Sequence, residues 1–364
     1  MKDQFNALTI AAVRSETADA TSFALRVPEE VREAYRFRPG QHLVVRSLLD
    51  GEEIRRTYSI CSGPGDRDLW ITVKRVDGGL FSGHAHSAFA INAQVEASPP
   101  AGRFALPVNE MGEKRTYLAI AAGSGITPVI AMIRHVLAAE PPSRFILIYG
   151  NRSFDSIIFR EALQDLKDSH LDRLTVCHVL SRDPDADADV PLLAGRIDGG
   201  KIRQLMPALV PLAEVDHVFL CGPGSLIKDA REALLDLGLP RERIHFEYFR
   251  AGPEMAQRRV TARPSASEAL TTGAEAILVI DGARHSIRVE PGLHIVDAAL
   301  AAGVRVPYSC KGGMCCTCRA KVIEGTLKMD RNFSLELWEI EAGYILTCQA
   351  QPTSDRVVLD YDQI

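Results

Sequence analysis

Five of the eight cysteines fall in the last fifth of this 364-residue chain, and their spacing points to a metal cluster. Cys310, Cys315, Cys318 and Cys348 form the pattern C-x4-C-x2-C…C, which is the plant-type spacing of [2Fe–2S] ligands. Two glycines in the loop let backbone N–H groups approach the cluster and offset its negative charge. A structural zinc is the alternative, but such sites usually combine two closely spaced pairs, and only one is present. We therefore predict a [2Fe–2S] cluster, with Cys316 as a neighbour that is not a ligand.

Two segments resemble known redox domains. Residues 272–364 resemble a plant-type ferredoxin throughout, and Arg56-Thr57-Tyr58-Ser59 resembles the R-x-Y-S flavin motif of ferredoxin–NADP reductase-like enzymes. The resemblance implies that Arg56 pairs with the flavin phosphates, that Tyr58 lies against the isoalloxazine and that Ser59 forms a hydrogen bond near its N5. Arginine suits phosphate oxygens because it can bind them bidentately, and a flat ring is stacked by an aromatic side chain. Without other matches, the simpler interpretation of these four residues is an ordinary β-strand.

Three further stretches keep the order and spacing of that reductase family. Residues 37–42 match its F-x-P-G-Q segment, and residues 100–104 match its P-x-G-x-F segment. Residues 74–82 resemble the second flavin strand with the turn that meets the phosphates. In this third stretch the resemblance implies contacts with the cofactor from Lys74, Val76, Gly79 and Ser82.

A nicotinamide site is expected where two strands end in glycine turns. Residues 122–128 join a strand to a helix, which presents backbone N–H groups to an anion at the helix N-terminus. Cys221-Gly222-Pro223 resembles the C-G-P turn that lies beside the nicotinamide in the family, although Cys221 could equally be an inert core thiol. The candidate nucleotide contacts in these turns are Gly123, Thr127, Pro128, Gly222 and Pro223.

Two arginines at the ends of successive strands suggest which nucleotide binds. The resemblance places Arg152, Ser153 and Arg182 around the adenosine 2′-phosphate. Arginines suit a phosphate, whereas a ribose diol is usually bound by an acidic residue. We therefore expect NADPH rather than NADH. The alternative is that both arginines are merely solvated.

The resemblance also implies the residues closest to the reacting atoms. In related reductases an acidic residue and an aromatic residue lie by the flavin and the incoming nicotinamide, and Glu247 and Phe249 are the candidates here. Packing within a strand would explain them equally well. The candidate catalytic residues are Ser59, Cys221 and Glu247.

The elements that must position these residues fall into three groups. Short β-rich runs between residues 7 and 106 predict an antiparallel β-barrel, and strand–helix alternation from about residue 114 predicts a parallel sheet in an α/β domain. The C-terminal part is expected to be an α+β domain of the β-grasp type, as in ferredoxins. The predicted boundaries are 1–108 for the FAD-binding barrel, 112–250 for the NAD(P)-binding domain, 251–271 for an exposed linker and 272–364 for the ferredoxin domain.

Composition excludes several classes of protein. The net charge of −5 does not suggest a nucleic-acid binder, and 46% hydrophobic with 24% charged residues is ordinary for a globular chain. No apolar run is long enough to cross a membrane, and charged residues interrupt the N-terminal segment where a signal peptide would need an apolar region. We therefore expect a cytoplasmic protein.

The order of the three domains predicts the function. The cysteine loop and residues 151–159 resemble the reductase subunits of phenylacetyl-CoA epoxidases. That resemblance implies electron transfer from NADPH through FAD, preferred to FMN, and a [2Fe–2S] cluster to an oxygenase, here a diiron epoxidase complex. A reductase for a ring-hydroxylating oxygenase or a steroid hydroxylase is the alternative within this class. An electron carrier or redox sensor without turnover is the alternative from another class.

Overall fold

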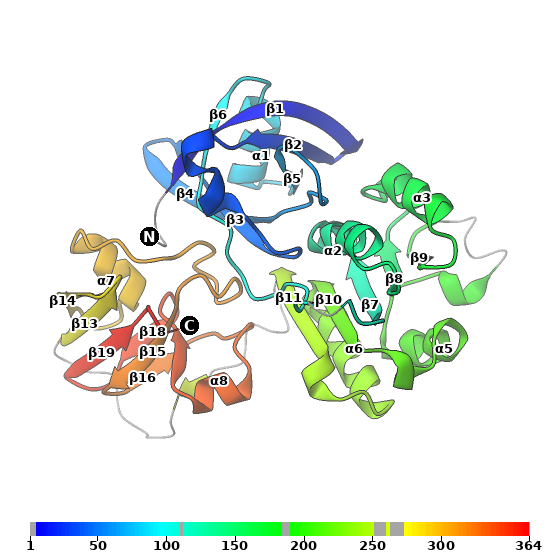
Figure 1. Ribbon diagram of the computed structural model, residues 1–364. Coiled ribbons are helices and arrows are strands. Elements are labelled where there is room, and N and C mark those ends of the chain that lie inside the picture. The colour runs from blue at the N-terminus through cyan, green and yellow to red at the C-terminus, as the bar shows by residue number, and fades with distance from the viewer. Residues whose placement is uncertain (1–4, 110–111, 184–189, 251–259, 263–272, 364) are drawn as a thin grey trace. The chain divides into compact units, whose positions relative to one another are not determined.

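The computed structural model describes residues 5–109, 112–183, 190–250, 260–262 and 273–363 (Figure 1). The chain divides into two compact units, one of residues 5–250 and the other of residues 251–364 with 1–4. Within the described ranges no helix has the length and apolar character needed to cross a membrane. The first unit contains two sheets and the second contains another two.

The N-terminal sheet of the first unit is an antiparallel barrel. Its strands are β1 (Asn6–Thr17), β2 (Ala20–Arg26), β3 (His42–Leu49), β4 (Glu52–Ser59), β5 (Leu69–Lys74) and β6 (Gln94–Ala97). They pair in the order β4-β3-β6-β1-β2-β5, and a bridge between Ile60 and Ile71 joins the two edges. Side chains alternate between core and solvent, as in β6, where Val95 and Ala97 are buried between exposed neighbours. The predicted barrel is confirmed.

One helix of the barrel is absent from our sequence-based expectation. Helix α1 (Leu80–Ala88) lies where the pattern suggested only a glycine-rich turn. Its sequence contains a glycine, which weakens a helix. Burial of Phe81 and Ala85 in the barrel core stabilises it instead.

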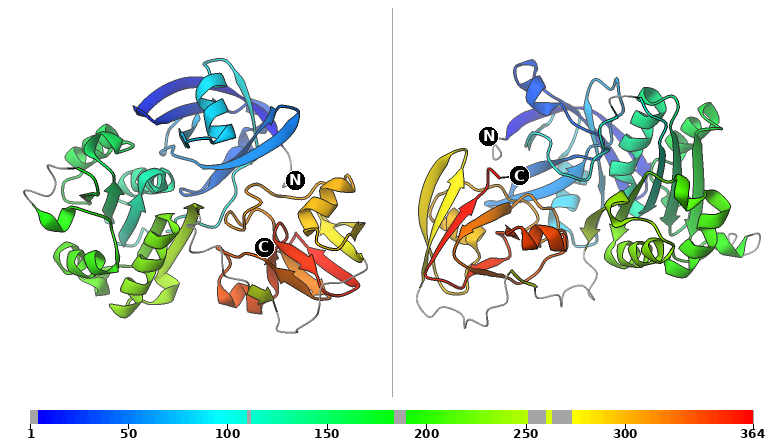
Figure 2. Two further views of the ribbon diagram at one scale, coloured as in Figure 1. Left: turned by 180° about the vertical axis from the view of Figure 1, so that it is seen from behind. Right: turned by 60° about the horizontal axis from the view of Figure 1, so that its bottom comes forward.

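The second sheet of this unit is parallel, as predicted. Its strands, in spatial order, are β11 (Ile244–Arg250), β10 (His217–Pro223), β7 (Thr116–Ala122), β8 (Arg144–Asn151) and β9 (Leu174–Leu180). Its helices are α2 (Ile126–Ala139), α3 (Arg160–Ser169), α5 (Gly199–Leu209) and α6 (Gly224–Asp236). Helices α2 and α3 cover one face of the sheet, and α5 and α6 cover the other (Figure 1 and Figure 2). Because both faces are covered, strands such as β7 are almost wholly buried.

Helix α3 begins later than the apolar pattern predicts. The sequence pattern of residues 156–170 predicts a helix over that whole stretch, whereas Phe159 has a left-handed backbone (φ 61°) and the helix begins at Arg160. Ile157, Ile158 and Phe159 are buried in the core, so their apolar character reflects packing rather than a helical face.

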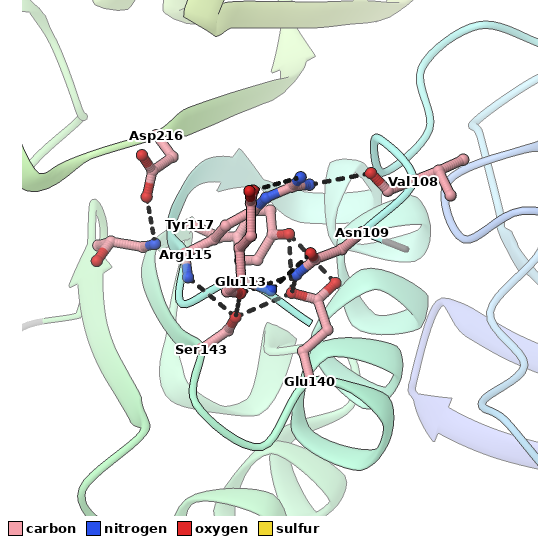
Figure 3. Close-up of polar contacts among 9 residues, drawn as sticks. Val108, Asn109, Glu113, Arg115, Tyr117, Glu140, Ser143 and Asp216 are labelled. Carbon is pink, nitrogen blue, oxygen red and sulfur yellow. Dashed lines mark hydrogen bonds and ion pairs between the residues drawn. The ribbon is translucent and has the colours of Figure 1, made fainter. Parts of the chain in front are cut away.

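A buried carboxylate ties the start of the parallel sheet to the segment that enters it (Figure 3). Glu140, which is 4% exposed, accepts hydrogen bonds from the hydroxyls of Tyr117 and Ser143, each at 2.9 Å. The side-chain amide of Asn109 also donates to it at 2.9 Å. The network fixes the segment after the barrel against the C-terminal end of α2.

The second unit has the predicted α+β composition. A five-stranded sheet contains β13 (Ala274–Ile280), β14 (Ala283–Val289), β15 (Arg319–Glu324), β17 (Tyr344–Leu346) and β19 (Arg356–Asp360). A three-stranded sheet contains β12 (Val260–Ala262), β16 (Leu327–Met329) and β18 (Ala350–Pro352), and the helices are α7 (Ile295–Ala301) and α8 (Leu337–Glu341). Asp281 and Gly282 both have positive φ in the β13–β14 turn, as a two-residue hairpin loop favours.

The linker prediction is only partly testable. Residues 251–259 and 263–271 lie outside the described part of the chain. Between them, Val260–Ala262 forms strand β12, which pairs with β16. This stretch is therefore a strand and not an open linker, because β16 offers it an edge for hydrogen bonding.

Candidate functional site

The R-x-Y-S motif occupies the end of β4. Ser59 is buried at 3% exposure, whereas Arg56 is exposed and its guanidinium donates to the Arg55 carbonyl at 2.7 Å. The Tyr58 ring lies 5.9 Å from the Phe81 ring of α1, and burial raises the pKa of its hydroxyl. Because residues two apart share a face of a strand, Arg56 and Tyr58 project from β4 on the same side.

The other predicted flavin contacts lie between the end of β5 and the first turn of α1. The Ser82 hydroxyl accepts from the Val76 amide at 3.1 Å, and Gly79 is the residue before the helix. No side chain caps this helix and its first turn holds no acidic residue, so its N–H groups are available to an anion. An exposed arginine and an uncapped helix N-terminus are donors that fit a diphosphate.

The three candidate catalytic residues are brought together around His42. Ser59 is directly opposite His42 in the β3–β4 pair, and Cys221 is opposite Glu247 in the β10–β11 pair. The Nδ1 atom of His42 lies 3.5 Å from Oε1 of Glu247, which connects the barrel to the parallel sheet. Burial and the Glu247 carboxylate raise the pKa of Cys221 well above its ordinary value.

A pocket of about 380 Å³ opens at the carboxyl ends of the parallel strands, where such sheets bind ligands. Seven of the predicted contacts line it: Lys74, Gly123, Arg152, Arg182, Gly222, Pro223 and Phe249. Gly125 packs on the Cys221 carbonyl so closely that a Cβ would collide with it. This contact brings the two glycine turns together.

Other predicted nucleotide contacts lie outside the pocket lining. Thr127 and Pro128 are buried in α2, and the Thr127 hydroxyl donates to the Ser124 carbonyl at 3.0 Å. Thr127 thus shapes the turn. The Ser156 hydroxyl fixes the backbone of Ser153: it accepts a hydrogen bond from the Ser153 amide and donates one to the Ser153 carbonyl.

Sequence reasoning missed several residues of this pocket. Arg196 lines the pocket together with Arg152 and Arg182. Asn151 is 8% exposed, and its side-chain NH₂ group has no hydrogen-bond partner in the described structure. The position of Asn151 at the end of β8 could have indicated it, whereas Arg196 follows a loop with no local signal.

The four candidate cluster ligands contact one another in two pairs. Cys310 lies in hydrogen-bonding contact with Cys315, and Cys318 with Cys348. Two pairs suit a cluster of two irons held by four thiolates. The described residues contain no group of three or more His, Cys, Asp or Glu side chains placed around a single ion.

The loop favours the thiolate form at Cys310, whereas hydrogen bonding within each cysteine pair and burial raise the pKa values of Cys315 and Cys318. Cys315 and the backbone amides of residues 312, 314 and 315 lower the pKa of Cys310 to about 5. The Gly312 amide donates to Sγ of Cys310 at 3.3 Å. Cys316 has a positive φ and its thiol contacts the Ser334 hydroxyl at 2.9 Å, in keeping with a residue that is not a ligand. These donors fit an anionic cluster.

Each segment matches a family of known domains. Residues 7–106 match the oxidoreductase FAD-binding domain, residues 119–232 the oxidoreductase NAD-binding domain, and residues 278–353 the 2Fe-2S iron-sulfur cluster binding domain. These matches confirm FAD and the [2Fe–2S] cluster, and they confirm a nicotinamide nucleotide, while the choice of NADPH stays a prediction. They also decide the cysteine site in favour of the cluster over zinc.

The chain is similar to other proteins over nearly their whole length. The chain is 42% identical to one of the components of the 1,2-phenylacetyl-CoA epoxidase of Escherichia coli K12, over 98% of each chain. It is 34% identical to the ferredoxin reductase component of the 3-ketosteroid-9-alpha-monooxygenase of Rhodococcus rhodochrous, over 97% of this chain and 96% of the other. Phthalate dioxygenase reductase, a solved structure, superposes with a TM-score of 0.58 at 26% identity over 98% of both chains.

Proposed function

Since the chain belongs to the family of oxygenase reductases with a flavin domain, a nicotinamide domain and a C-terminal [2Fe–2S] domain, we propose that it supplies electrons from NADPH to a phenylacetyl-CoA epoxidase. The observation that carries the proposal is 42% identity, over 98% of both chains, to a component of such an epoxidase. The steroid monooxygenase reductase is less similar, at 34%.

The bound groups define the redox chemistry, and the chain positions them. When bound, FAD exchanges a hydride with the nicotinamide and passes single electrons to the [2Fe–2S] cluster. Arg56 and the N-terminus of α1 would bind the flavin diphosphate, and Tyr58 would lie along its ring. Cys310, Cys315, Cys318 and Cys348 would bind the two irons.

NADPH is supported by the charge of the pocket. Arg152, Arg182 and Arg196 line it, and no carboxylate of the described residues forms an ion pair with any of the three. The Arg182 amide donates to the Arg152 carbonyl at 2.7 Å, so these two arginines leave adjacent strand ends. Guanidinium groups at a pocket wall suit a phosphate ester, which they can bind bidentately.

Reconstitution tests the choice of oxygenase. The purified protein is combined with the diiron oxygenase component of a phenylacetyl-CoA epoxidase, NADPH and phenylacetyl-CoA, and the epoxide product is measured. Parallel reactions contain a ring-hydroxylating dioxygenase or the 3-ketosteroid hydroxylase with its own substrate. We expect the highest rate with the epoxidase. A higher rate with the steroid hydroxylase would favour the second candidate, for which the relative at 34% identity is the supporting observation.

A preliminary measurement distinguishes turnover from simple electron carriage. The wild-type protein should hold one flavin and two irons per chain, and NADPH should drive reduction of ferricyanide. A protein that binds its cofactors but shows no NADPH-dependent reduction would be an electron carrier or sensor.

A further inference from the structure

Asn151 is a buried polar residue of the nucleotide pocket whose side chain is not satisfied. It ends β8, it is 8% exposed and it lines the pocket at the carboxyl ends of the parallel strands. Its NH₂ group has no hydrogen-bond partner in the described structure. Because a buried donor without a partner is costly, such a group usually has a function or binds a ligand.

The sheet fixes the position of Asn151. The residue is opposite Leu180 in the β8–β9 pair, and its carbonyl accepts a hydrogen bond from the Ser181 amide at 2.9 Å. The preceding Gly150 is opposite Ala122 in the β7–β8 pair. Asn151 is therefore held between the end of β7, which leads into the first glycine turn, and the end of β9.

The side chain of Asn151 lies on the side of β8 that supports this glycine turn. Residues two apart on a strand share a face, so Tyr149 and Asn151 project on the same side. The Tyr149 hydroxyl lies near the Asn151 NH₂ group without a hydrogen bond between them, and it donates to the Gly123 carbonyl at 3.0 Å. The turn leads into α2, where backbone N–H groups suit the diphosphate of a nucleotide.

The arginines of the pocket lie on the other side of Asn151. Arg152 follows it directly, and the Arg182 amide donates to the Arg152 carbonyl at 2.7 Å. Both arginines line the pocket and are the proposed contacts of the 2′-phosphate. In the adenosine half of NADPH a single ribose joins the diphosphate to the 2′-phosphate. Since Asn151 lies between the residues proposed for these two groups in the order of the sheet, the ribose is the part of the nucleotide that reaches it.

We propose that Asn151 binds the adenosine ribose and that its neutral side chain lets the pocket accept a 2′-phosphate. The inference rests on the binding of NADPH in the proposed function. In dinucleotide-binding folds an acidic residue usually binds the ribose diol of NAD. A carboxylate at this position would repel a 2′-phosphate, whereas the amide offers an uncharged donor. Asn151 is thus a residue that determines which nucleotide the pocket selects.

Binding of half of the nucleotide tests the position of the contact. The probe is adenosine 2′,5′-bisphosphate, which contains the ribose and a phosphate on each side of it but lacks the nicotinamide half. Its dissociation constant and that of NADP⁺ are measured by isothermal titration calorimetry on the full-length holoprotein. Asn151→Ala should raise both constants by about threefold to about tenfold, as expected for one net hydrogen bond between neutral groups. The kcat with NADPH should change less than about twofold, because the contact is the same in the ground state and the transition state.

An isosteric substitution tests the charge. Asn151→Asp should lower kcat/KM for NADPH at least about tenfold more than kcat/KM for NADH, because only NADPH carries the 2′-phosphate that the carboxylate repels. Asn92→Asp is the matched control. It adds the same charge at an exposed position of the same unit outside the pocket lining, and it should retain the wild-type ratio of the two nucleotides.

Unchanged affinity for adenosine 2′,5′-bisphosphate in Asn151→Ala would overturn the inference, as would equal losses for NADPH and NADH in Asn151→Asp. If Asn151→Ala does not fold, the isosteric variant decides. Ferricyanide reduction by the wild type is measured first. A wild type that uses neither nucleotide would contradict the proposed function itself, whereas an active wild type whose Asn151 variants behave like it would contradict only the role of Asn151.

Discussion

Removal of one pocket arginine at a time tests how the protein distinguishes NADPH from NADH. Arg182 and Arg196 both line the pocket at the carboxyl ends of the parallel strands. The Gly195 amide donates to the Leu180 carbonyl at 2.8 Å, which fixes the segment carrying Arg196 beside the end of β9. The variants are Arg182→Ala and Arg196→Ala.

The expected magnitude follows from the lost contact. A hydrogen bond to a charged group contributes about 1.5–3 kcal/mol. Since about 1.4 kcal/mol is a factor of ten, each variant should lose about tenfold to about 150-fold in kcat/KM for NADPH. NADH lacks the 2′-phosphate, so its kcat/KM should change less than about threefold.

Steady-state reduction of ferricyanide measures both nucleotides without an oxygenase. Arg67→Ala is the matched control, since Arg67 is an exposed arginine of the same unit outside the pocket lining. The control should retain wild-type values with both nucleotides. Equal losses for NADPH and NADH in the pocket variants would refute this reasoning, because the arginines would then bind a part that both nucleotides share.

Three further predictions concern the cluster, the fold and its pH dependence. Cys348→Ser removes one thiolate and should abolish both the cluster and electron supply to the oxygenase. NADPH-driven reduction of ferricyanide should persist, because the flavin domain lies in the other unit. A normal rate with the oxygenase would show that the cluster is not on the electron path. Glu140→Ala removes the acceptor of three hydrogen bonds and leaves the buried Tyr117 hydroxyl without one, so it should lower the free energy of unfolding by about 1–3 kcal/mol in urea titrations. The exposed Glu161→Ala should have little effect. Burial, with a smaller effect of His217, lowers the pKa of His245 to about 4 in the folded protein. Because an unfolded chain binds this proton already near pH 6.5, the folded state loses stability as the pH falls from about 6.5 toward about 4. Between pH 7 and pH 5, His245→Gln should therefore lose less of its free energy of unfolding than the wild type in urea titrations. An equal loss in the two proteins would show that His245 does not cause this pH dependence.

Local pattern in the sequence determined most of the architecture. Residues 145–149 are a continuous apolar run that predicts a buried strand, and they form the centre of β8, because a strand covered on both faces is apolar where it is buried. The cysteine pattern predicted the cluster, since three of its four candidate ligands lie in one loop and their spacing is a local property. The flavin and nucleotide motifs were likewise contiguous stretches whose order identified the family.

Only the tertiary structure decided what depends on contacts between distant segments. Helix α1 is a poor helix by composition and exists because Phe81 and Ala85 complete the barrel core. Strand β12 forms because β16 offers it an edge. Neither partner can be seen in the local sequence.

The same reason explains the site contacts that the sequence did not predict. Glu247 was predicted as a site residue, but its contact with His42 was not, because the two residues are separated by more than half the chain. Arg196 joins the pocket because its loop bonds back to β9 through Gly195. Sequence therefore specified which residues could bind each cofactor, whereas folding alone determined which distant side chains meet there, because such contacts depend on register and packing between sheets.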